Sequence, residues 1–491
     1  MHHLLWWRMA NKDSTLGIQY DKLEDTNAWY TEVITKSGLI EYTDVSGCYI
    51  LRPKAQYIWD TIRNYMDKKL RARGVRNASF PLFIPEHLLM KEKEHVEGFS
   101  PEVAWVTHAG NSKLAERLAV RPTSETIMYP AYAKWIRSYN DLPLKLNQWC
   151  SVVRWEFKHP MPFLRSREFH WQEGHTAFAT QEEAKAEATD ILLNVYKKTY
   201  EELLAIPSLA GYKSEKEKFA GAVRTLSLEM FLPIGKAIQG CTTHYLGQNF
   251  SKPFNIIFLD KDQKKKHPHQ NSWGFSTRSI GIMVMMHSDS RGLVLPPKVA
   301  EHKVIIIPIF TKSNRDEILK YALSIKKKLS KFNPILDARE QYSVGWKLNE
   351  AELNGVPIRI EVGKRELADK SVTLVRRDTL EKQSVSIRRL ERRVKDELQA
   401  MHQNLFKRAE QFLESSIVEE TKELKKIVAY VKAKRVVKTV YDGARETDEI
   451  IKEKTGAKTL VIPFKEKLKQ GLRCPFSGNP AKHVVYIARS L

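Results

Sequence analysis

Residues 163–175, FLRSREFHWQEGH, form a segment whose side chains do not fit a core strand. In a β-strand, alternate side chains point to alternate faces, so one face would hold Arg165, Arg167, Phe169, Trp171, Glu173 and His175. The opposite face would hold Ser166, Glu168, His170, Gln172 and Gly174. Because neither face is an apolar stripe, the pattern favours a strand that binds a ligand. A solvated strand with cross-strand ion pairs is the alternative.

The preceding segment, KLNQWCSVVRWEF (145–157), is also strand-like, and the connection KHPMP (158–162) contains two prolines. Together they predict a long antiparallel hairpin with a short turn. Arg154 and Glu156 would lie just before this turn, and two further arginines just after it. Arginine binds phosphate oxygens in a bidentate manner, a carboxylate can accept from an exocyclic amine, and an aromatic ring can stack on a base. The hairpin therefore suits a nucleotide.

Length and composition indicate a large globular protein. The chain has 491 residues, which suggests about three domains, and 42% of them are hydrophobic, ample for large buried cores. It contains no run of about 18 apolar residues, so we expect no membrane span, and its first residues do not read as a signal peptide. Cys48, Cys150, Cys241 and Cys474 lie far apart, which indicates free thiols and a cytoplasmic location.

The formal charge of +23 is unevenly spread along the chain. Residues 301–400 carry 22 Lys and Arg against 15 Asp and Glu, and residues 401–491 carry 19 against 11. Such an excess predicts a polyanionic partner, for which nucleic acid is the usual candidate. Charge that serves only solubility is the alternative.

The chain changes character near residue 300. Before it, apolar spacing predicts a helix at 54–73, a helix at about 181–204, and a helix that begins at Arg278. After it, the order strand, helix, strand, helix, strand, strand predicts a compact α/β domain. A highly charged helical segment at about 387–435 leads into a final basic region. The fold class is therefore α/β (α+β).

Three more segments carry polar residues suited to a ligand. In RPTSETIMYP (121–130), Thr123 or Ser124 can cap a helix with Glu125 in its first turn. Alternatively, Glu125 accepts a substrate ammonium and Thr123 adds a hydroxyl contact. Arg278 stands where a strand changes to a helix. A Gly-flanked loop offers Gln239, Thr242 and His244, although His244 can equally be a hydrogen-bonded core histidine.

These segments in combination resemble a known enzyme family. An Arg-bearing hairpin followed about 120 residues later by an Arg that opens an apolar helix is similar to motifs 2 and 3 of class II aminoacyl-tRNA synthetases. The helix at 54–73 with FPLFIP resembles the dimer-forming motif 1. Six segments together resemble prolyl-tRNA synthetase of the eukaryote/archaeal-like type. They are RPTSET, VRWEFKHPMPFLRSREFHWQEGH, GHTAFAT, KFAGA, AIQGCTTHYLGQNFSKPF and NSWGFSTRSIG.

The resemblance, which runs from about residue 20 to the C-terminus, implies four regions. These are an N-terminal extension (1–19), a class II catalytic domain built on an antiparallel sheet with flanking helices (20–299), an α/β anticodon-binding domain (300–400) and a small α+β C-terminal domain (401–491). It also implies an activity. The family makes prolyl-adenylate from L-proline and ATP with Mg²⁺, transfers the prolyl group to tRNA(Pro), and is expected here as a cytoplasmic homodimer.

The family's site residues carry over by position. Arg154 and Arg278 are the expected catalytic residues. The proline-binding set implied by the resemblance is Phe99, Thr123, Glu125, Arg154, Trp171, Glu173, His175 and His244. The ATP-binding set is Arg154, Glu156, Arg165, Ser166, Phe169, Gln239, Thr242, Ser276 and Arg278, with Gln239 near the Mg²⁺ that accompanies ATP.

The sequence departs from the family near its C-terminus. Relatives of this type often hold a zinc ion with four cysteines there, but here Cys474 alone remains, and one thiolate cannot build a tetrahedral site. We therefore expect no zinc. A related threonine enzyme would need a zinc ligand set that the sequence does not offer. A synthetase-like protein without activity would be expected to have lost Arg154, Arg278 or Glu125, and all three are present.

Overall fold

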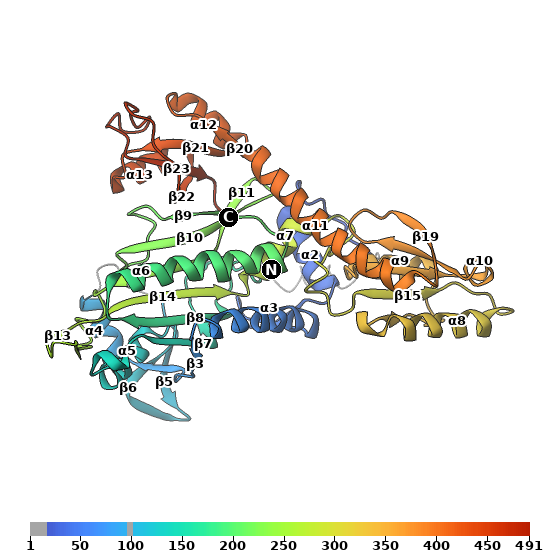
Figure 1. Cartoon of the computed structure of the whole chain (residues 1–491), viewed down its shortest axis with the longest axis horizontal. Helices are drawn as coiled ribbons and strands as arrows, with labels where there is room; N and C mark the ends of the chain where they lie inside the picture. Colours follow the sequence, from blue (N-terminus) through green and yellow to red (C-terminus); the bar gives the residue numbers. More distant parts are fainter. Residues whose placement is uncertain (1–16, 96–101) are drawn as a thin grey trace.

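A single eleven-stranded sheet runs through most of the molecule in a computed structural model that describes residues 17–95 and 102–491 (Figure 1). Its strands, in spatial order, are β20 (Ile417–Glu419), β21 (Val436–Tyr441), β23 (His483–Ala488), β22 (Lys458–Pro463), β9 (Leu209–Tyr212), β10 (Arg224–Leu232), β11 (Lys236–Gly247), β14 (His269–Ser276), β8 (Glu168–Phe178), β7 (Leu144–Val153) and β3 (Arg76–Asn77). All neighbours from β21 to β7 pair antiparallel, as predicted for the catalytic sheet.

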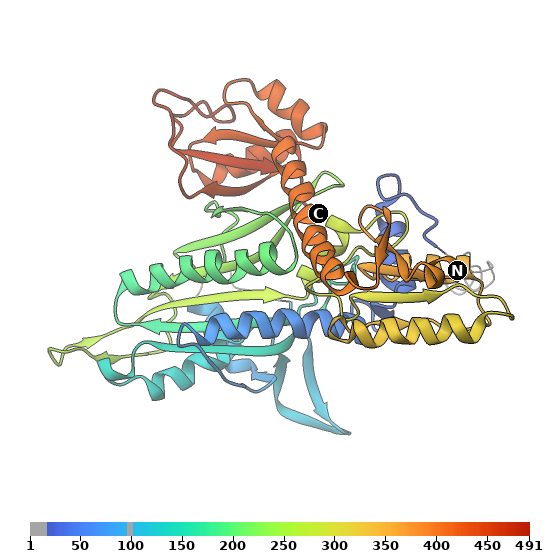
Figure 2. The ribbon, with the colours of Figure 1, turned by 45° about the vertical axis from the view of Figure 1, so that its right-hand side comes forward.

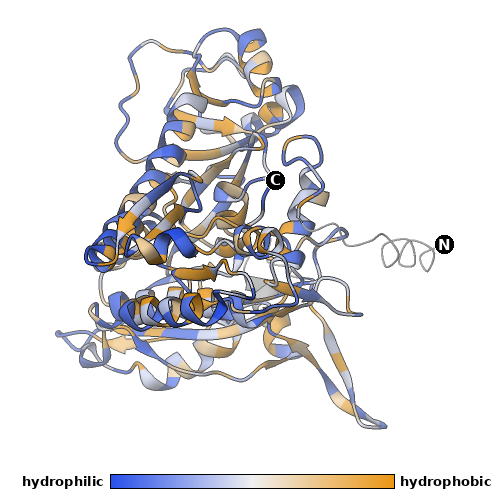
Figure 3. Ribbon diagram, turned by 90° about the vertical axis from the view of Figure 1, so that its right-hand side faces the viewer, coloured by the Kyte–Doolittle hydropathy of each residue, from blue (hydrophilic) through white to orange (hydrophobic). Residues whose placement is uncertain are grey.

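Helices cover the middle of this sheet and bury its main apolar core. They are α2 (Thr26–Lys36), α3 (Pro53–Arg71), α6 (Gln181–Asp190) and α7 (Arg278–His287), with two π-helical segments, η2 (Ile191–Tyr196) and η3 (Thr199–Leu203), that prolong α6. The core includes Trp29, Ile62 and Trp273, all almost fully buried. Figure 3 shows hydrophobic residues along the central strands and hydrophilic ones along outer loops and helix faces. The predicted helix at 181–204 exists, but 11 of its residues, in η2 and η3, are π-helical.

Smaller elements surround the site or lie at the rim. They are α4 (Glu86–His95), α5 (Glu125–Trp135), the short 3₁₀ helices η1 (Tyr139–Asp141) and η4 (Ser330–Phe332), and the strand groups β1 (Ile40–Tyr42) with β2 (Tyr49–Leu51), β4 (Phe83–Pro85) with β5 (Trp105–Ala109) and β6 (Ser112–Val120), and β12 (Phe258–Leu259) with β13 (Lys265–Lys266). No helix within the described ranges is both long enough and apolar enough to cross a bilayer.

The predicted α/β domain after residue 300 is a five-stranded sheet with helices. Its spatial order is β16 (Ile335–Leu336), β15 (Val304–Pro308), β17 (Ile358–Val362), β18 (Ser371–Arg376) and β19 (Lys382–Ser386). The helices are α8 (Arg315–Lys328), α9 (Val344–Leu353) and α10 (Lys364–Ala368). The strand β15 is buried at every residue, which explains its continuous apolar run VIIIP.

A long helix, α11 (Leu390–Ser416), leads from this domain to the C-terminal region with α12 (Leu424–Lys432) and α13 (Arg445–Thr455) (Figures 1 and 2). The prediction of one helical segment over 387–435 is wrong, because β20 interrupts it after Ser416. The C-terminal strands extend the catalytic sheet through β22 and β9, where Ile462 lies opposite Tyr212. Gly211 permits this approach, since a Cβ there would lie 2.2 Å from the Ile462 carbonyl oxygen.

The predicted hairpin exists, but its turn is much longer than five residues. The strands β7 and β8 pair from Leu144 opposite Ala177 to Val153 opposite Glu168, so residues 154–167 form the connection. Arg154 keeps one backbone bond across it, from its N–H to the Arg167 carbonyl at 2.7 Å. The two prolines and the positive φ of Phe163 are incompatible with continued strand pairing.

Candidate active site

A cavity of about 250 Å³ opens over the face formed by β8, β11 and β14 next to the start of α5. Twelve of the residues expected from the sequence line it: Thr123, Glu125, Arg154, Phe169, Trp171, Glu173, His175, Gln239, Thr242, His244, Ser276 and Arg278. The odd-numbered side chains of β8 thus share one face, as strand periodicity predicts.

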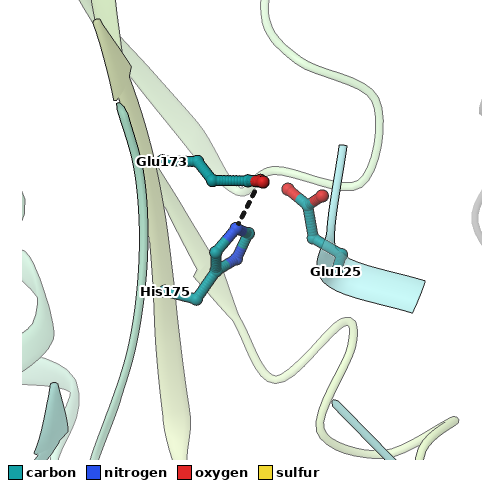
Figure 4. A group of neighbouring side chains, drawn as sticks. All are labelled: Glu125, Glu173 and His175. Atoms are coloured by element: carbon teal, nitrogen blue, oxygen red, sulfur yellow. Dashed lines mark hydrogen bonds and ion pairs between the residues drawn. The ribbon is translucent and has the colours of Figure 1, made fainter. Parts of the chain in front are cut away.

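One end of the cavity contains Glu125, Glu173 and His175, all buried (Figure 4). The Glu173 carboxylate accepts hydrogen bonds from the Ser124 N–H at 3.1 Å, the Ser124 hydroxyl at 2.5 Å and the Gln148 amide at 3.2 Å. It also lies 3.0 Å from His175 Nε2. The acceptor positions of Glu173 are therefore largely occupied, and this carboxylate organises the pocket.

Glu125 is the carboxylate with more room for a ligand. The Thr123 hydroxyl donates a hydrogen bond to this carboxylate. Ser124 is the residue before α5, but its side chain makes no capping bond to the helix. The capping interpretation of RPTSET is therefore wrong, because the Thr123 and Ser124 hydroxyls both point to carboxylates.

The three groups at this end of the cavity are arranged to bind a cation. Their ligand atoms lie within 4.8 Å of one another, a spacing that a metal ion could also use. Burial lowers the pKa of the His175 imidazole, but Glu125 and Glu173 raise it more, so the net shift is upward. Burial likewise raises the pKa of Glu173, and its hydrogen bonds from His175 and Ser124 bring it below the ordinary value. Two carboxylates beside one imidazole make this end of the cavity suited to a cationic group such as an ammonium.

Arg154 lies between the two ends of the cavity. Its guanidinium carbon is 5.1 Å from the Trp171 ring centroid and 5.6 Å from that of Phe169, within cation–π range. Its Nε donates to the Pro122 carbonyl oxygen at 2.9 Å. These contacts fix the side chain and leave the rest of the guanidinium fork for an anion.

The other end of the cavity contains Gln239, Thr242 and Arg278, whereas His244 lies across the sheet from His175, with Ser272 of β14 between them. The His244 ring is bonded on both sides, to Thr225 Oγ1 at 2.9 Å and to Thr242 Oγ1 at 3.0 Å. Burial and the positive charge of Arg154 lower the pKa of His244 to about 3, so the ring is neutral. Arg278 donates to the carbonyl oxygens of Leu164 and Gln239 at 3.1 and 3.3 Å, which directs it toward this end.

A second cavity of about 410 Å³ adjoins the first and shares Glu217, Gln239 and Arg278 with it. Arg165 lines this second cavity and not the first, so it does not lie beside Arg154 as the predicted hairpin with a short turn implies. Lys213 and Lys458 also line it. Its positive side chains suit the outer phosphates of a nucleotide whose base end lies in the first cavity.

Three other expected residues lie elsewhere. Glu156 is exposed in the 154–167 connection and lines neither cavity. Ser166 lines a separate cavity of about 70 Å³ beside His170 and Thr277. Phe99 lies outside the described residues. The placements of Glu156 and Ser166 differ from a regular strand because the chain leaves the β7–β8 ladder before it reaches them.

Several lining residues escaped the sequence reasoning. They are Glu217, Phe219, Thr225, Gly240, Cys241, Ser272, Trp273, Gly274 and Phe275. The rings of Phe219 and His244 are 4.6 Å apart, and Phe219 belongs to the KFAGA stretch, whose glycine and small residues were the one available signal. Arg167 is a structural residue: it donates to the Ser46 and Phe157 carbonyls and lies over the Trp155 ring.

Comparisons with known proteins agree with this geometry. Residues 105–287 match the tRNA synthetase class II core domain (G, H, P, S and T), residues 303–397 match the anticodon binding domain, and residues 424–491 match the prolyl-tRNA synthetase C-terminal family. The proline--tRNA ligase of Alkaliphilus oremlandii is 48% identical over 486 residues, which is 98% of this chain and 100% of that protein. This chain belongs to the proline–tRNA ligase family.

Other members of the family extend the comparison. The bifunctional glutamate/proline--tRNA ligase of Mus musculus is 46% identical over 98% of this chain, and the chain spans about a third of that longer protein. The crystal structure of the prolyl-tRNA synthetase of Cryptosporidium parvum, complexed with halofuginone and AMPPNP, superposes with a TM-score of 0.93 at 47% identity. The match covers 97% of this chain and 100% of that one. The predicted class II fold is thereby confirmed.

Proposed function

We propose that this proline–tRNA ligase family member activates proline with ATP and transfers the prolyl group to tRNA(Pro), and that both steps occur in the first cavity. The observation that carries the proposal is a single cavity with a carboxylate-rich end, an opposite end that contains Arg278, and Arg154 between them. Such an arrangement holds two substrates whose reacting groups are both anionic.

Proline occupies the end that contains Glu125, Glu173 and His175. Its ring amine is a secondary ammonium, which Glu125 accepts while the Thr123 hydroxyl holds that carboxylate in place. Trp171 forms an apolar wall for the ring, and His244 closes the far side as a neutral group. An aromatic wall with one available carboxylate matches a small apolar cation.

ATP occupies the end that contains Gln239, Thr242 and Arg278, with its base near Phe169. Arg154 clamps the α-phosphate and the proline carboxylate, while Arg165 and Arg278 bind the outer phosphates. A proline carboxylate oxygen attacks the α-phosphorus as the bond to the bridging oxygen breaks and pyrophosphate leaves. The reaction needs positioning and charge stabilisation and no protein nucleophile.

Magnesium accompanies ATP at the shared wall of the two cavities. Gln239 lies directly opposite Glu229 across the β10–β11 ladder, and both carry oxygen atoms of the type that Mg²⁺ prefers. Glu229 accepts from the Ser227 hydroxyl at 2.8 Å and lies 3.0 Å from the Lys213 ammonium, so its orientation is fixed. The metal would neutralise phosphate charge there.

The tRNA reaches both halves of the molecule. Its terminal ribose hydroxyl attacks the prolyl-adenylate carbonyl and AMP leaves. In the anticodon-binding domain, the Tyr342 and Trp346 rings stack at 3.8 Å with an interplanar angle of 13°, and the Arg339 guanidinium lies about 5 Å from both. Tyr342 is exposed. Unpaired bases stack on such aromatic and arginine planes, so this group is our candidate contact for the anticodon.

The remaining parts of the proposal are a homodimer and a cytoplasmic location. Tyr57 is exposed on α3, in the predicted motif 1 region, and Tyr42 and Ile50 are exposed on the nearby strands β1 and β2. Exposed apolar side chains of this size suit a protein interface. The relative from Arabidopsis thaliana is a cytoplasmic proline--tRNA ligase, 45% identical over 98% of this chain. Light scattering of the purified chain checks the dimer: a monomer at micromolar concentration would refute it.

Proline-dependent ATP–pyrophosphate exchange tests the proposed activity. We expect exchange with proline and charging of tRNA(Pro) transcripts by the purified chain. Exchange with another amino acid but not with proline would overturn the specificity, and threonine is the first to try. An absence of exchange with all twenty amino acids would favour an inactive, RNA-binding synthetase-like protein.

A further inference from the structure

The strand β11 has a β-bulge at the point where it enters the cavity. Ser227 lies opposite Thr242 and Leu228 opposite Cys241, but Glu229 lies opposite Gln239, so Gly240 has no partner in β10. One extra residue in a strand reverses the alternation of side chains beyond it. The bulge therefore changes which residues of β11 face the substrates.

This reversal is required for the ATP end of the cavity. Gln239 and Thr242 are three residues apart, so a regular strand would point them to opposite faces. Here both share one face, because Gln239 Nε2 donates to Ser227 Oγ at 3.3 Å and Ser227 is the cross-strand partner of Thr242. The bulge also directs the Gln239 carbonyl toward Arg278, which donates to it at 3.3 Å.

A buried tyrosine from the helical layer holds the bulge. The Tyr200 hydroxyl donates to the Gly240 carbonyl oxygen at 3.1 Å, and Tyr200 is fully buried. Tyr200 belongs to the π-helical segment η3, and π-helical turns occur often at functional sites. A Cβ on Gly240 would lie 2.8 Å from this hydroxyl and 2.7 Å from the Met230 sulfur, so any larger residue here would displace the Tyr200 or Met230 side chain.

We propose that Tyr200 is a positioning residue for ATP: its hydroxyl fixes the Gly240 bulge and thereby aims Gln239, Thr242 and Arg278 at the nucleotide. Tyr200 lines neither of the two cavities that hold the substrates, so its effect is transmitted through β11. The inference rests on the proposed function, because it assumes that the Gln239 end binds ATP.

The molecule supplies a matched control one helical turn earlier. Tyr196 is also fully buried, and its hydroxyl donates to Gln172 Oε1 at 2.8 Å. Gln172 lies on the opposite face of β8 from the cavity and does not line it. The substitutions Tyr196→Phe and Tyr200→Phe therefore remove the same atom from the same layer, but only the second frees a group of the bulge.

The experiment compares Tyr200→Phe with Tyr196→Phe in the full chain. For Tyr200→Phe we expect the affinity for AMPPNP, measured by calorimetry, and kcat/KM for ATP to fall about five- to tenfold, the effect of losing one buried hydrogen bond. KM for proline should stay within about twofold. For Tyr196→Phe we expect neither affinity to change, although both variants lose similar thermal stability. Equal effects of both variants on ATP, or an unchanged ATP affinity in Tyr200→Phe, would overturn the proposal.

A double-mutant cycle tests the route through Gly240. Gly240→Ala alone should weaken AMPPNP binding, because its methyl group meets the Tyr200 hydroxyl. In the Tyr200→Phe background the same change should cost clearly less, and additive effects would show that Tyr200 acts by another route. Since AMPPNP binding needs no amino acid, a chain that binds AMPPNP but fails in proline exchange would refute the proposed function and still test this inference.

Discussion

The contacts that hold the Arg154 side chain in place use its Nε and its ring-facing surface, and they leave its two terminal nitrogens available to a ligand. Aromatic rings of Phe169 and Trp171 lie against it, and its Nε is committed to the Pro122 carbonyl. In the proposed reaction the two terminal nitrogens would bind the substrate anions without reorganisation. Preorganised donors of this kind account for much of the rate enhancement in group transfer.

Replacement of Arg154 by Ala should lower the rate of proline activation far more than it lowers stability. The expected loss of transition-state stabilisation is about 2–4 kcal/mol, or roughly 30- to 1000-fold in kcat, as for one lost oxyanion donor. Stopped-flow measurement of adenylate formation checks it. Arg167→Ala is the control, because Arg167 binds the Ser46 and Phe157 carbonyls: it should lower Tm, and a comparable fall in kcat would contradict the assignment.

Strand periodicity was sufficient to place the side chains of β8 that line the cavity. Phe169, Trp171, Glu173 and His175 share one face because alternation holds wherever the β7–β8 ladder is intact. The same rule failed for Arg165, Glu156 and Ser166, which lie in the connection. It could not reveal the Gly240 bulge either, since the register of β11 depends on its neighbours and not on its own sequence.

At the scale of elements, the turn at residues 474–480 is held by the carboxylate of Asp442. Asp442 accepts from the Ser477 hydroxyl at 2.8 Å, the Asn479 amide at 3.0 Å and the Ala444 N–H at 3.1 Å. These bonds tie the 474–480 turn to the end of β21. Burial raises the pKa of Asp442, and the hydrogen bonds outweigh that effect and lower it to about 2.

The stability of the chain should therefore depend on Asp442 between about pH 4 and pH 2. Because its folded pKa is below the ordinary 3.8, its contribution is present above about pH 4 and is lost as the pH falls toward 2. We expect Asp442→Asn to cost about 2 kcal/mol in the free energy of unfolding at pH 6 and almost nothing at pH 2. Urea titrations check this.

Asp448 is a control, because its pKa is shifted in the opposite direction from that of Asp442. Burial raises its pKa, so its ionisation opposes folding above its ordinary pKa. Asp448→Asn should therefore gain stability relative to the natural chain as the pH rises from 3 to 6. If the stability of the two variants relative to the natural chain changed with pH in the same direction, the pKa shifts assigned to the two carboxyl groups would be contradicted.

The stacked rings of Tyr342 and Trp346 lie on α9 and the turn before it, and their removal should weaken tRNA binding without affecting ATP or proline. Tyr342→Ala should raise KM for tRNA(Pro) about 5- to 150-fold, since one base–aromatic stack contributes about 1–3 kcal/mol. KM values for ATP and proline in pyrophosphate exchange should not change. An unaltered KM for tRNA would exclude Tyr342 from the anticodon contact. Exposed Leu323 on α8 supplies Leu323→Ala as the control.

At the scale of the molecule, ion pairs join the anticodon-binding domain to the catalytic domain. Arg377 donates to both oxygens of Asp289 at 2.6 and 2.8 Å and to the Glu352 carbonyl at 2.9 Å. Its side chain is 2% exposed, whereas that of Asp289 is 43% exposed. Arg291 adds a second link to Glu352 at 2.8 Å. These contacts fix the distance between the anticodon site and the cavity.

Loss of Arg377 should therefore separate the two half-reactions. Arg377→Ala should leave ATP–pyrophosphate exchange within about twofold, but lower kcat/KM for tRNA charging about tenfold, because a tRNA must meet both domains at once. The partly exposed partner limits the stability cost to about 1–3 kcal/mol. Arg392→Ala, which removes an exposed pair with Asp396, should change neither rate. An equal loss in both half-reactions would point to damage within the catalytic domain.

The sequence indicated the order of the domains but not how closely they join. The change in the pattern of predicted strands and helices near residue 300 and the apolar run of β15 predict a separate α/β unit. Such a unit is present. No local pattern predicts that β22 pairs with β9. Pairing between strands about 250 residues apart depends on the assembled fold, and its only local trace is Gly211.

Because the C-terminal region shares a sheet with the catalytic domain, it cannot be removed without exposing a strand of that domain. Removal of residues 424–491 would leave the backbone of β9 uncovered along the side where Gly211 and Tyr212 now pair with β22. An uncovered strand edge is a template for intermolecular pairing. A shortened chain would then be prone to aggregate, even though it would retain every side chain proposed to bind proline. Natural truncations of this kind should be rare for the same reason.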